Sequence, residues 1–352
     1  MINFILKRFW YGMLVLIGVV FIVFFLFNML PINPARLTMG QRADISTVEA
    51  VEKELGLNLT WHAKLKRYVG DLSPIWIHEN SPEAEEKYRY SVITELGSES
   101  VLVAKLPYLG RSFQTRRRVT EILAEKIPPT FILALAAIIL ATIVGVLLGI
   151  ISAINQNNFI DNTSVIMSVI GISQPSYVSS IVLLFVFTWW LYDYTGLNTG
   201  ALFDLDELGD PITRWENLIL PTIALGIRPI AIITMLTRSS MIEVLSQDYI
   251  RTAKAKGLGY WKVLFKHALR NAMNPVITSI SGWFAALLAG AFFVELILDF
   301  KGLGYETVKA LINFDIPVVM GAVLFIASVF VVINILVDLM YGFLDPRVSL
   351  KA

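Results

Sequence analysis

Long hydrophobic runs with few or no charged residues, separated by polar segments, dominate the sequence pattern of this chain. The first run, residues 9–30, contains 22 residues, and a helix needs about 20 apolar residues to cross a bilayer. The later runs are also too long and too uniformly apolar for the strands of a membrane β-barrel. The pattern therefore predicts membrane helices at residues 9–30, 130–153, 164–190, 218–236, 275–298 and 316–343.

The first hydrophobic run is predicted to be retained as a membrane helix. A signal peptide pairs a basic start with a shorter apolar region and a small-residue cleavage site. Here the run ends in Pro31-Ile-Asn-Pro34, which does not resemble an Ala-x-Ala cleavage site.

The distribution of Lys and Arg predicts the orientation of these helices. From Arg238 to Arg270 the chain carries seven basic residues against two acidic ones, which is typical of a cytoplasmic loop. Residues 193–216 carry six acids and one base, as expected outside the cytoplasm. An even number of spans then places both termini in the cytoplasm.

This topology divides the chain into an N-terminal helix, an outer segment, a membrane core and a short tail. Their boundaries are residues 1–30, 31–126, 127–345 and 346–352, with a cytoplasmic loop at 238–274 inside the core. In the outer segment, Ser81 followed by Pro and Glu is typical of a solvated turn or a helix start, and residues 90–94 and 101–104 have weak strand character. Residues 115–126 either form an amphipathic helix along the outer membrane surface, with Val119, Ile122 and Leu123 facing lipid or protein, or present a solvated arginine face. We therefore expect a small extracytoplasmic α(+β) insertion.

Proline and glycine residues modify the predicted spans. Pro128-Pro129 is predicted to open the second span. Gly145 and Gly149 have a spacing that allows close approach of another helix. Arg228-Pro229 is predicted to break the fourth helix.

Polar residues inside the spans are candidates for function because such groups are costly in a membrane. Arg228 either lines a cavity or forms an internal ion pair with Glu295. Ser173-Gln174-Pro175 either exposes backbone carbonyl groups to a water-filled path or is a packing kink.

The composition excludes several classes of protein. Hydrophobic residues make up 56% of the chain and charged residues 16%, whereas soluble domains contain about 25% charged residues. A net charge of +1 gives no sign of a nucleic-acid partner. The sequence has no cysteine for disulfides or thiolate metal sites, and its histidines show no metal-ligand spacing. The absence of G-x-x-x-x-G-K-[ST], H-E-x-x-H and G-x-S-x-G argues against an ATPase or hydrolase site in this chain.

One polar segment, residues 248–271, has helical character. It is rich in Ala, Lys, Leu and Arg and contains no proline before Pro275. The Gly257-Leu-Gly259 break predicts two short helices that meet at a turn. Because the segment lies in a predicted cytoplasmic loop, we expect a partner inside the cell to recognise it.

This segment resembles the EAA-type cytoplasmic loop of ABC-transporter permeases. A similar variant, Asp248–Leu258 followed by Lys266–Val276, is found in the branch that includes dipeptide, oligopeptide and nickel permeases. The usual Glu-Ala-Ala triplet is replaced by Arg251-Thr252-Ala253, and the proline comes late, as in that branch. Further stretches that resemble the branch are residues 30–36, 54–57, 109–113, 294–295, 302–304 and 344–348. The segment at about residues 71–107 is longer than expected for the family.

The resemblance implies an all-α permease of the type I ABC importer kind, with six transmembrane helices in a bacterial-type plasma (inner) membrane. Its implied partners are a second homologous permease, two cytoplasmic ATPases that bind ATP and Mg²⁺, and an extracytoplasmic substrate-binding protein. The permease itself binds no cofactor and moves its cargo, here di- or oligopeptides, by alternating access.

In this chain the resemblance implies a coupling helix around residues 251–258 that docks on an ATPase. Gly257 is expected to allow a sharp turn, and Ala253 to allow close approach. The implied coupling residues are Tyr249, Arg251, Ala253, Lys254, Lys256, Gly257, Leu258, His267, Arg270 and Asn271. The expected translocation path includes Ser173, Gln174, Pro175, Arg228 and Glu295.

Two alternatives remain open from the sequence. An ion-coupled secondary transporter is expected to show inverted repeats, broken paired helices and a titratable residue in mid-membrane. No convincing repeat is present, and Glu295 lies near the outer end of its span. An ABC permease for nickel or another non-peptide cargo fits the same motifs, because substrate choice lies largely in the binding protein.

Overall fold

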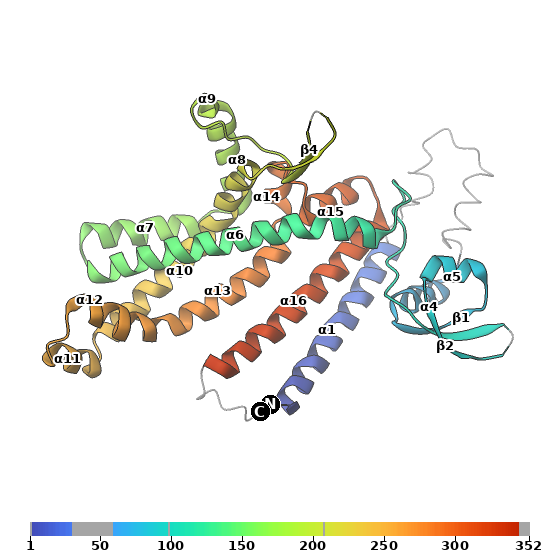
Figure 1. Ribbon diagram of the computed structural model, residues 1–352, viewed down its shortest axis with the longest axis horizontal. Helices are drawn as coiled ribbons and strands as arrows, with labels where there is room; N and C mark the ends of the chain where they lie inside the picture. The colour runs from blue at the N-terminus through green and yellow to red at the C-terminus, as the bar shows by residue number, and fades with distance from the viewer. Residues whose placement is uncertain (1, 30–58, 98, 207, 345–352) are drawn as a thin grey trace. The chain divides into compact units, whose positions relative to one another are not determined.

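The computed structural model describes most of the chain, and it is mainly helical (Figure 1). The described residues are 2–29, 59–97, 99–206 and 208–344. The predicted motifs at residues 30–36, 54–57 and 345–348, and the predicted tail at 346–352, lie outside them.

Within the described residues, four helices are long and apolar enough to cross a membrane, and a bent helix pair makes five if it counts as one span. These results confirm a helical protein with several membrane-length helices. The four helices are α1 (Ile2–Met29), α6 (Val119–Ile154), α10 (Glu216–Leu245) and α16 (Ile316–Leu344).

The bent pair replaces the single third span that the sequence predicts. Helix α7 (Phe159–Ser173) and the segment formed by α8 (Ser176–Phe185) and η1 (Val186–Trp190) are bent by 103°. Proline has no backbone N–H, and the residue before it avoids helical geometry. Gln174 is accordingly extended, with φ −84° and ψ 125°, so the helix ends before Pro175. The bend is far larger than the packing kink that the sequence left open.

The predicted fifth span appears as a helix, but with different boundaries. Helix α13 (Arg270–Gly290) begins within the basic segment, and α14 (Phe292–Ile297) follows it separately. Arg270, Asn271 and Asn274 lie in the first turns of α13, so it is less apolar than the four long helices.

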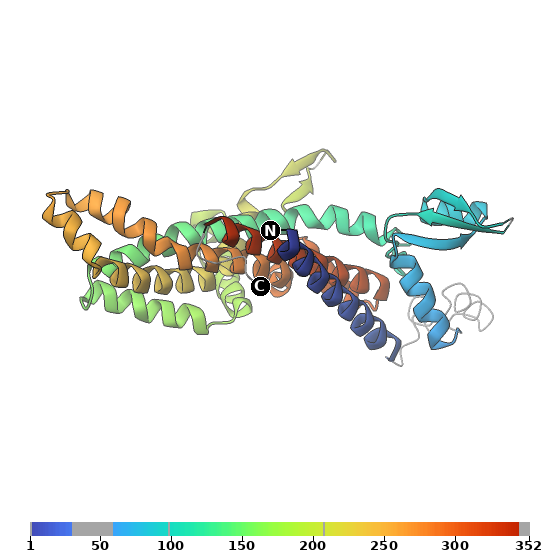
Figure 2. The same cartoon turned by 90° about the horizontal axis from the view of Figure 1, so that it is seen from below.

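Helices α6, α7 and α10 run side by side in both views (Figures 1 and 2). The small residues of α6 explain the close approach of α6 and α10. A Cβ added to Gly145 would lie 2.8 Å from the Ile233 side chain, and one added to Gly149 would lie 2.5 Å from Thr237 Cβ. The predicted use of the G-x-x-x-G spacing for close helix packing is therefore confirmed.

Two sequence expectations about proline are wrong. Helix α10 continues through Arg228-Pro229, because both of its prolines, Pro221 and Pro229, are buried and neighbouring packing holds the helix together. Helix α6 begins at Val119, well before Pro128-Pro129, and includes both prolines.

The predicted surface helix at residues 115–126 is also wrong. Its helical part is the start of α6, and no separate amphipathic helix forms there. Val119, Ile122 and Leu123 are at most 5% exposed, so of the two predicted environments, lipid or protein, they face protein.

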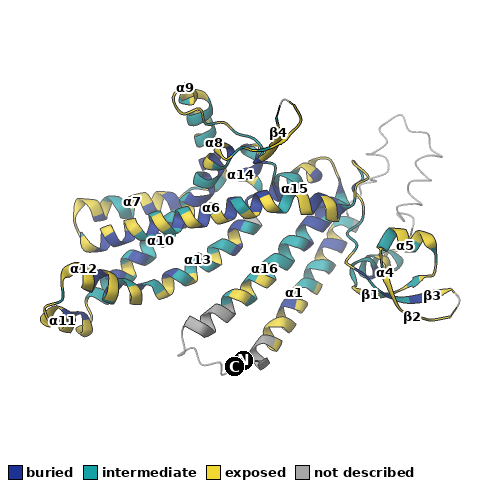
Figure 3. Ribbon diagram, in the orientation of Figure 1, coloured by how far each residue is buried: buried dark blue, intermediate teal, exposed yellow. Residues whose placement is uncertain are grey.

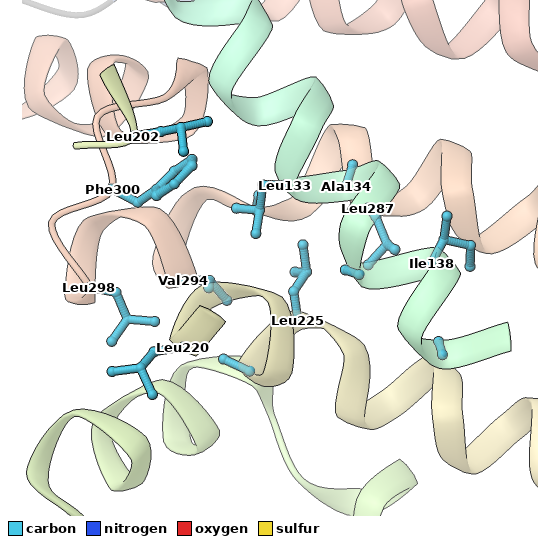
Figure 4. Packing of buried hydrophobic residues seen from close by; sticks show 14 of the residues in the cluster. Leu133, Ala134, Ile138, Leu202, Leu220, Leu225, Leu287, Val294, Leu298 and Phe300 are labelled. Carbon is cyan, nitrogen blue, oxygen red and sulfur yellow. The ribbon is translucent and has the colours of Figure 1, made fainter. Parts of the chain in front are cut away.

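The main hydrophobic core joins α6, α10, α13 and α14 (Figure 4). Leu133 and Ile138 of α6 pack with Leu225 of α10, Leu287 of α13 and Val294 of α14. Between membrane helices, such packed aliphatic side chains stabilise through van der Waals contacts, because lipid tails are as apolar as leucine. The cluster therefore fixes the helices that flank the segment of functional interest.

Residues 61–104 form a small subdomain of helices and strands. A three-stranded antiparallel sheet has the order β1-β3-β2, and Val101 and Val103 of its central strand are buried. The predicted strands at 90–94 and 101–104 correspond to β2 and β3, while β1 and α4 were not predicted. The elements are α4 (Trp61–Leu72), β1 (Ile75–Glu79), α5 (Pro82–Tyr88), β2 (Ser91–Glu95) and β3 (Ser100–Ala104).

The predicted helix start at Ser81 is confirmed. Its hydroxyl accepts a hydrogen bond from the Ala84 N–H at 3.3 Å, as a helix cap does.

Short elements complete the described chain. They are α9 (Tyr192–Thr195), β4 (Phe203–Leu205), β5 (Pro211–Thr213), α11 (Asp248–Ala255), α12 (Tyr260–Lys262), η2 (Val263–Leu269) and α15 (Leu303–Ile312).

Candidate functional site: the basic helix pair

The predicted pair of short helices is present between α10 and α13. Helix α11 is followed by a turn, and α12 then continues through the π-helix η2 into α13. The outward side of α11 and α12 is exposed in Figure 3. We call α11, α12 and η2, residues 248–269, the basic helix pair.

The inward face of α11 packs on a small hydrophobic core. Ile250 is 1% exposed and Ala253 is 7% exposed, and both contact the cluster of Val263, Leu264 and Ala268. Ala253 was expected to allow close approach of a partner, but its small side chain packs inside this chain.

The outward face of α11 carries the basic side chains. Arg251, Lys254 and Lys256 are exposed. The ion pair between Arg251 and Asp248 has an N–O distance of 3.5 Å, with side chains 77% and 96% exposed. Such exposed pairs contribute less than about 1 kcal/mol, so this charge is available to a partner with acidic groups.

The turn between the two helices requires glycine. Gly257 has φ +77°, in the left-handed region that other residues adopt at a cost. Its N–H bonds the Lys254 carbonyl oxygen at 3.0 Å, which closes the end of α11. No side chain or backbone atom lies within 4 Å of where its Cβ would be, so the turn is open on its outer side.

Two hydrogen bonds from Asn271, at the start of α13, connect the two ends of the basic helix pair. The Asn271 side-chain amide donates to the Tyr249 hydroxyl at 3.1 Å and to the His267 carbonyl oxygen at 2.9 Å. The structure thus brings together three of the predicted coupling residues. Arg270 is exposed beside them, and Leu258 is half-buried against the small core.

A buried ion pair near the basic helix pair was missed from the sequence. Asp161, in the first turn of α7, is 1% exposed, and Arg238 of α10 donates to it from Nε at 2.5 Å and Nη2 at 2.7 Å. The carboxylate also accepts bonds from the Ser152 hydroxyl and from the Asn157 N–H. These bonds tie the turn between α6 and α7 to α10.

The sequence indicated the acidic residue of this ion pair but not its partner. An acidic residue in the first turn of a helix is a common feature, but the partner lies 77 residues away. Arg238 had been counted among the charges of the cytoplasmic loop, although it points into the protein.

The predicted path residues are not joined by hydrogen bonds or ion pairs in the part of the chain that the structure describes. Ser173, Gln174 and Pro175 lie at the break between α7 and α8, where Ser173 and Pro175 are exposed. Arg228 is exposed on α10, and its guanidinium lies 5.7 Å from the centre of the Trp283 ring.

Glu295 does not pair with Arg228. It is 0% exposed, and its carboxylate accepts hydrogen bonds from the Thr130 hydroxyl at 2.7 Å and the Tyr305 N–H at 2.9 Å. The Thr130 oxygen in turn accepts a bond from the Leu303 N–H at 2.7 Å. The ion-pair alternative is therefore wrong, and Glu295 fastens the loop at residues 300–305 to α6.

Among the described residues, no group of three or more His, Asp or Glu side chains is arranged to hold a metal ion. The arrangement is suited to binding a partner through an exposed basic surface.

Together, the fold and the site define a multi-span α-helical membrane protein that presents a basic helix pair between two of its helices. Residues 145–350 match the family described as "Binding-protein-dependent transport system inner membrane component", and residues 1–81 match the corresponding N-terminal family. The chain belongs to this family of inner-membrane transport components.

Several named relatives are similar over most of the chain. The dipeptide transport system permease protein DppB of Escherichia coli (strain K12) is 33% identical over 369 residues, which cover 100% of both chains. DppB of Alkalihalophilus pseudofirmus is 33% identical and covers 95% of this chain and 96% of its own. DppB of Bacillus subtilis (strain 168) is 42% identical over 66% of this chain and 71% of its own.

A solved structure has a similar fold over part of the chain. A chain from the MetNI methionine ABC transporter, in an inward-facing conformation, matches with a TM-score of 0.50 and 14% identity. The match covers 64% of this chain and 97% of that one.

Proposed function

We propose that this chain is one of two permease subunits of an ATP-driven importer that moves di- or oligopeptides across the inner membrane. The family assignment and the dipeptide permeases among its relatives support this proposal. Nickel or another non-peptide cargo is the alternative within the same class.

The observation that carries the proposal is that helix α11 has one buried face and one exposed basic face. Its inner face is anchored by Ile250, while its outer face presents exposed Arg251 and Lys254 at an open glycine turn. A helix fastened in this way can transmit a push from a partner to α10 and α13. We therefore assign α11 as the coupling helix that docks on a cytoplasmic ATPase.

ATP hydrolysis belongs to two partner ATPases, which bind ATP and Mg²⁺. When ATP binding closes the ATPase pair, the coupling helices of both permeases move together. The membrane helices then change between inward-facing and outward-facing packings. ATP supplies the free-energy difference that shifts this two-state equilibrium.

The proposed topology has six spans, with both termini in the cytoplasm. The six are α1, α6, the bent pair of α7 with α8 and η1, α10, α13 and α16. Residues 31–126 then lie outside as an insertion, facing an extracytoplasmic substrate-binding protein. The basic helix pair lies on the opposite, cytoplasmic side, in agreement with its positive charge.

The proposed translocation path runs past the break at Ser173–Pro175 and past Arg228. An exposed arginine on a membrane helix is costly unless it faces water or a polar partner, which supports a place for Arg228 at a cavity. Glu295 joins the path only when the loop at residues 300–305 moves away from it, because its carboxylate is hydrogen-bonded to Thr130 and to Tyr305 of that loop.

Affinity purification of the tagged chain from solubilised membranes tests this function. We expect a second permease and one or two ATPases to be recovered with it. The double variant Lys254→Glu/Lys256→Glu is expected to lower ATPase recovery at least tenfold without affecting the second permease. Lys66→Glu, a single charge reversal on α4, serves as the control.

Equal ATPase recovery with the charge-reversed variant would contradict the coupling assignment. Recovery of the chain alone would contradict the ABC importer function and favour the ion-coupled alternative. The native chain has no cysteine, so Ser81→Cys and Lys262→Cys can be labelled separately. The proposed topology requires labelling from opposite sides of the membrane.

A further inference from the structure

A cavity of about 690 Å³ lies between α4, α5 and the ends of α1 and α16. Phe24 of α1 and Met320 and Leu324 of α16 line its apolar part. Lys64 and Arg67 of α4 line its polar part. One end of the cavity therefore suits hydrocarbon, and the other suits an anion.

The apolar part lies on two helices that contact little protein. The membrane-length parts of α1 and α16 are only 17% and 28% buried. Because both are long apolar helices, their exposed sides face the acyl chains of a bilayer. Of the three apolar lining residues, Phe24 and Leu324 are buried and Met320 is half-buried, so a lipid chain would reach the apolar part of the cavity beside Met320.

The polar part has an excess of positive charge. Among its lining residues, five basic side chains stand against three acidic ones. The Asp71 carboxylate already accepts a hydrogen bond from the Tyr88 hydroxyl at 2.8 Å. Neither Lys64 nor Arg67 forms an ion pair within the described residues.

Lys87 adds a third cation to the polar part of the cavity. Its ammonium lies 4.6 Å from the centre of the Tyr88 ring and 5.3 Å from that of Tyr108. It forms no ion pair within the described residues. Burial lowers the pKa of Lys87, while the nearby Asp71 carboxylate acts in the opposite direction. A bound anion would stabilise its charged form.

Helix α4 explains how the cations gather at one site. Lys64, Arg67 and Asp71 are spaced three and four residues apart, so they lie on one face of the helix. Lys66 lies off this face, is exposed and does not line the cavity. The sequence of α4 thus provides a matched control residue.

We propose that this cavity binds an anionic phospholipid, with its phosphate at Lys64, Arg67 and Lys87 and an acyl chain along Phe24, Met320 and Leu324. A free phosphate ion would use only the polar part of the cavity. A lipid uses both parts, and basic groups beside membrane helices are suited to such headgroups. The lipid would fasten the subdomain at residues 61–104 to the ends of α1 and α16.

Native mass spectrometry of the delipidated transporter complex, titrated with phosphatidylglycerol, tests this proposal. We expect at least tenfold weaker retention with Lys64→Ala/Arg67→Ala, and weaker retention with Met320→Trp, which fills the apolar part. Lys66→Ala is expected to bind as the native complex does. Millimolar inorganic phosphate is not expected to displace the lipid.

Equal lipid retention in all variants would overturn the proposal. Full displacement by inorganic phosphate would show an anion site only, and displacement by a dipeptide would show a cargo site; both outcomes overturn it. If the variants fail to assemble, a photoreactive phosphatidylglycerol can be used on the native complex. Crosslinks must then map to residues 61–72 and 316–324, and crosslinks elsewhere would contradict the assignment.

Discussion

Two charged regions close together in the sequence use their charges in opposite ways. Arg238, at the start of the basic stretch, is turned inward and paired with the buried Asp161. Arg251, a few turns later, is 77% exposed and has only a weak contact with Asp248. The two arginines differ in their exposure to water. A buried charge is destabilising unless a partner of opposite charge compensates it, whereas an exposed charge is stabilised by water and gains little from a partner.

The comparison teaches which charges can carry recognition. A buried pair cannot give up a partner without leaving an uncompensated charge, so Arg238 serves the fold. The exposed cations of α11 lose little by exchanging water for an acidic surface. The exposed cations of the basic helix pair can therefore bind and release an acidic partner, as the proposed function requires.

The largest expected effect comes from breaking the buried pair. Arg238→Ala leaves the Asp161 carboxylate buried without its cation, which typically costs about 3–5 kcal/mol. We expect about 3 kcal/mol, because Arg238 is itself 23% exposed and water can reach the site. Arg251→Ala is expected to cost less than about 1 kcal/mol. Unfolding of the purified chain in detergent by increasing SDS measures the stability of both variants. Equal losses of stability would contradict the difference between the buried and the exposed arginine.

A smaller effect is expected from the packed glycines of α6. Gly149→Ala places a Cβ 2.5 Å from Thr237 Cβ and 2.8 Å from the Thr234 carbonyl oxygen. Overpacking of this kind costs about 1–3 kcal/mol. Gly282→Ala is the control, since nothing lies within 4 Å of its Cβ position. The same SDS titration compares the two, and an unchanged midpoint for Gly149→Ala would show that α6 and α10 are less tightly packed.

The turn glycine of the basic helix pair gives a local effect. Gly257→Ala places a side chain at φ +77°, which costs about 1–2 kcal/mol. Gly259→Ala is the matched control, because Gly259 has φ −61°. Hydrogen exchange is expected to become faster at residues 248–262 only in the Gly257 variant, with global stability nearly unchanged. A change in global unfolding would show that the turn is part of the core.

The subdomain at residues 61–104 offers an intermediate case, a half-buried histidine. Burial and, secondarily, the Lys105 charge lower the pKa of His78 below its usual 6.5. The unfolded chain therefore binds a proton first as the pH falls below 6.5, and the subdomain loses stability between 6.5 and the lowered folded value. Stability above pH 6.5 is independent of this group.

His78→Phe is expected to remove this pH dependence. A phenyl ring can still stack on Tyr88, whose ring centre lies 4.1 Å from that of His78. Thermal unfolding of both proteins between pH 5 and pH 8, followed through the subdomain, measures the effect. A pH dependence that persists in the variant would assign it to another group.

Local patterns were sufficient for much of the fold and of the candidate site. The hydrophobic runs predicted α1, α6, α10 and α16, and the Gly257-Leu-Gly259 break predicted two short helices. Each of these features depends on neighbouring residues: an apolar stretch that fits a bilayer, or a glycine that permits a turn. The family resemblance carried by residues 248–276 was confirmed by the comparisons.

Features that join distant segments could not be predicted. The sequence did not reveal that Arg228-Pro229 leaves α10 intact, or that Glu295 binds Thr130 and a loop instead of Arg228. Ala253 was expected to allow close approach of a partner. Its side chain instead packs inside the chain against η2, and the sequence does not show that contact. In each case the outcome was decided by a neighbour many residues away.

The sequence by itself determined that this protein is helical, membrane-spanning and equipped with a basic helix pair. These features depend on neighbouring residues, because a long apolar run is stable in a bilayer and a charged segment is stable in water. Only the tertiary structure decided which charges are available to a partner. It turned Arg238 toward Asp161, closed Glu295 into a neutral network and left α11 exposed. The physical reason is that the cost of a buried charge is set by the groups that surround it in space.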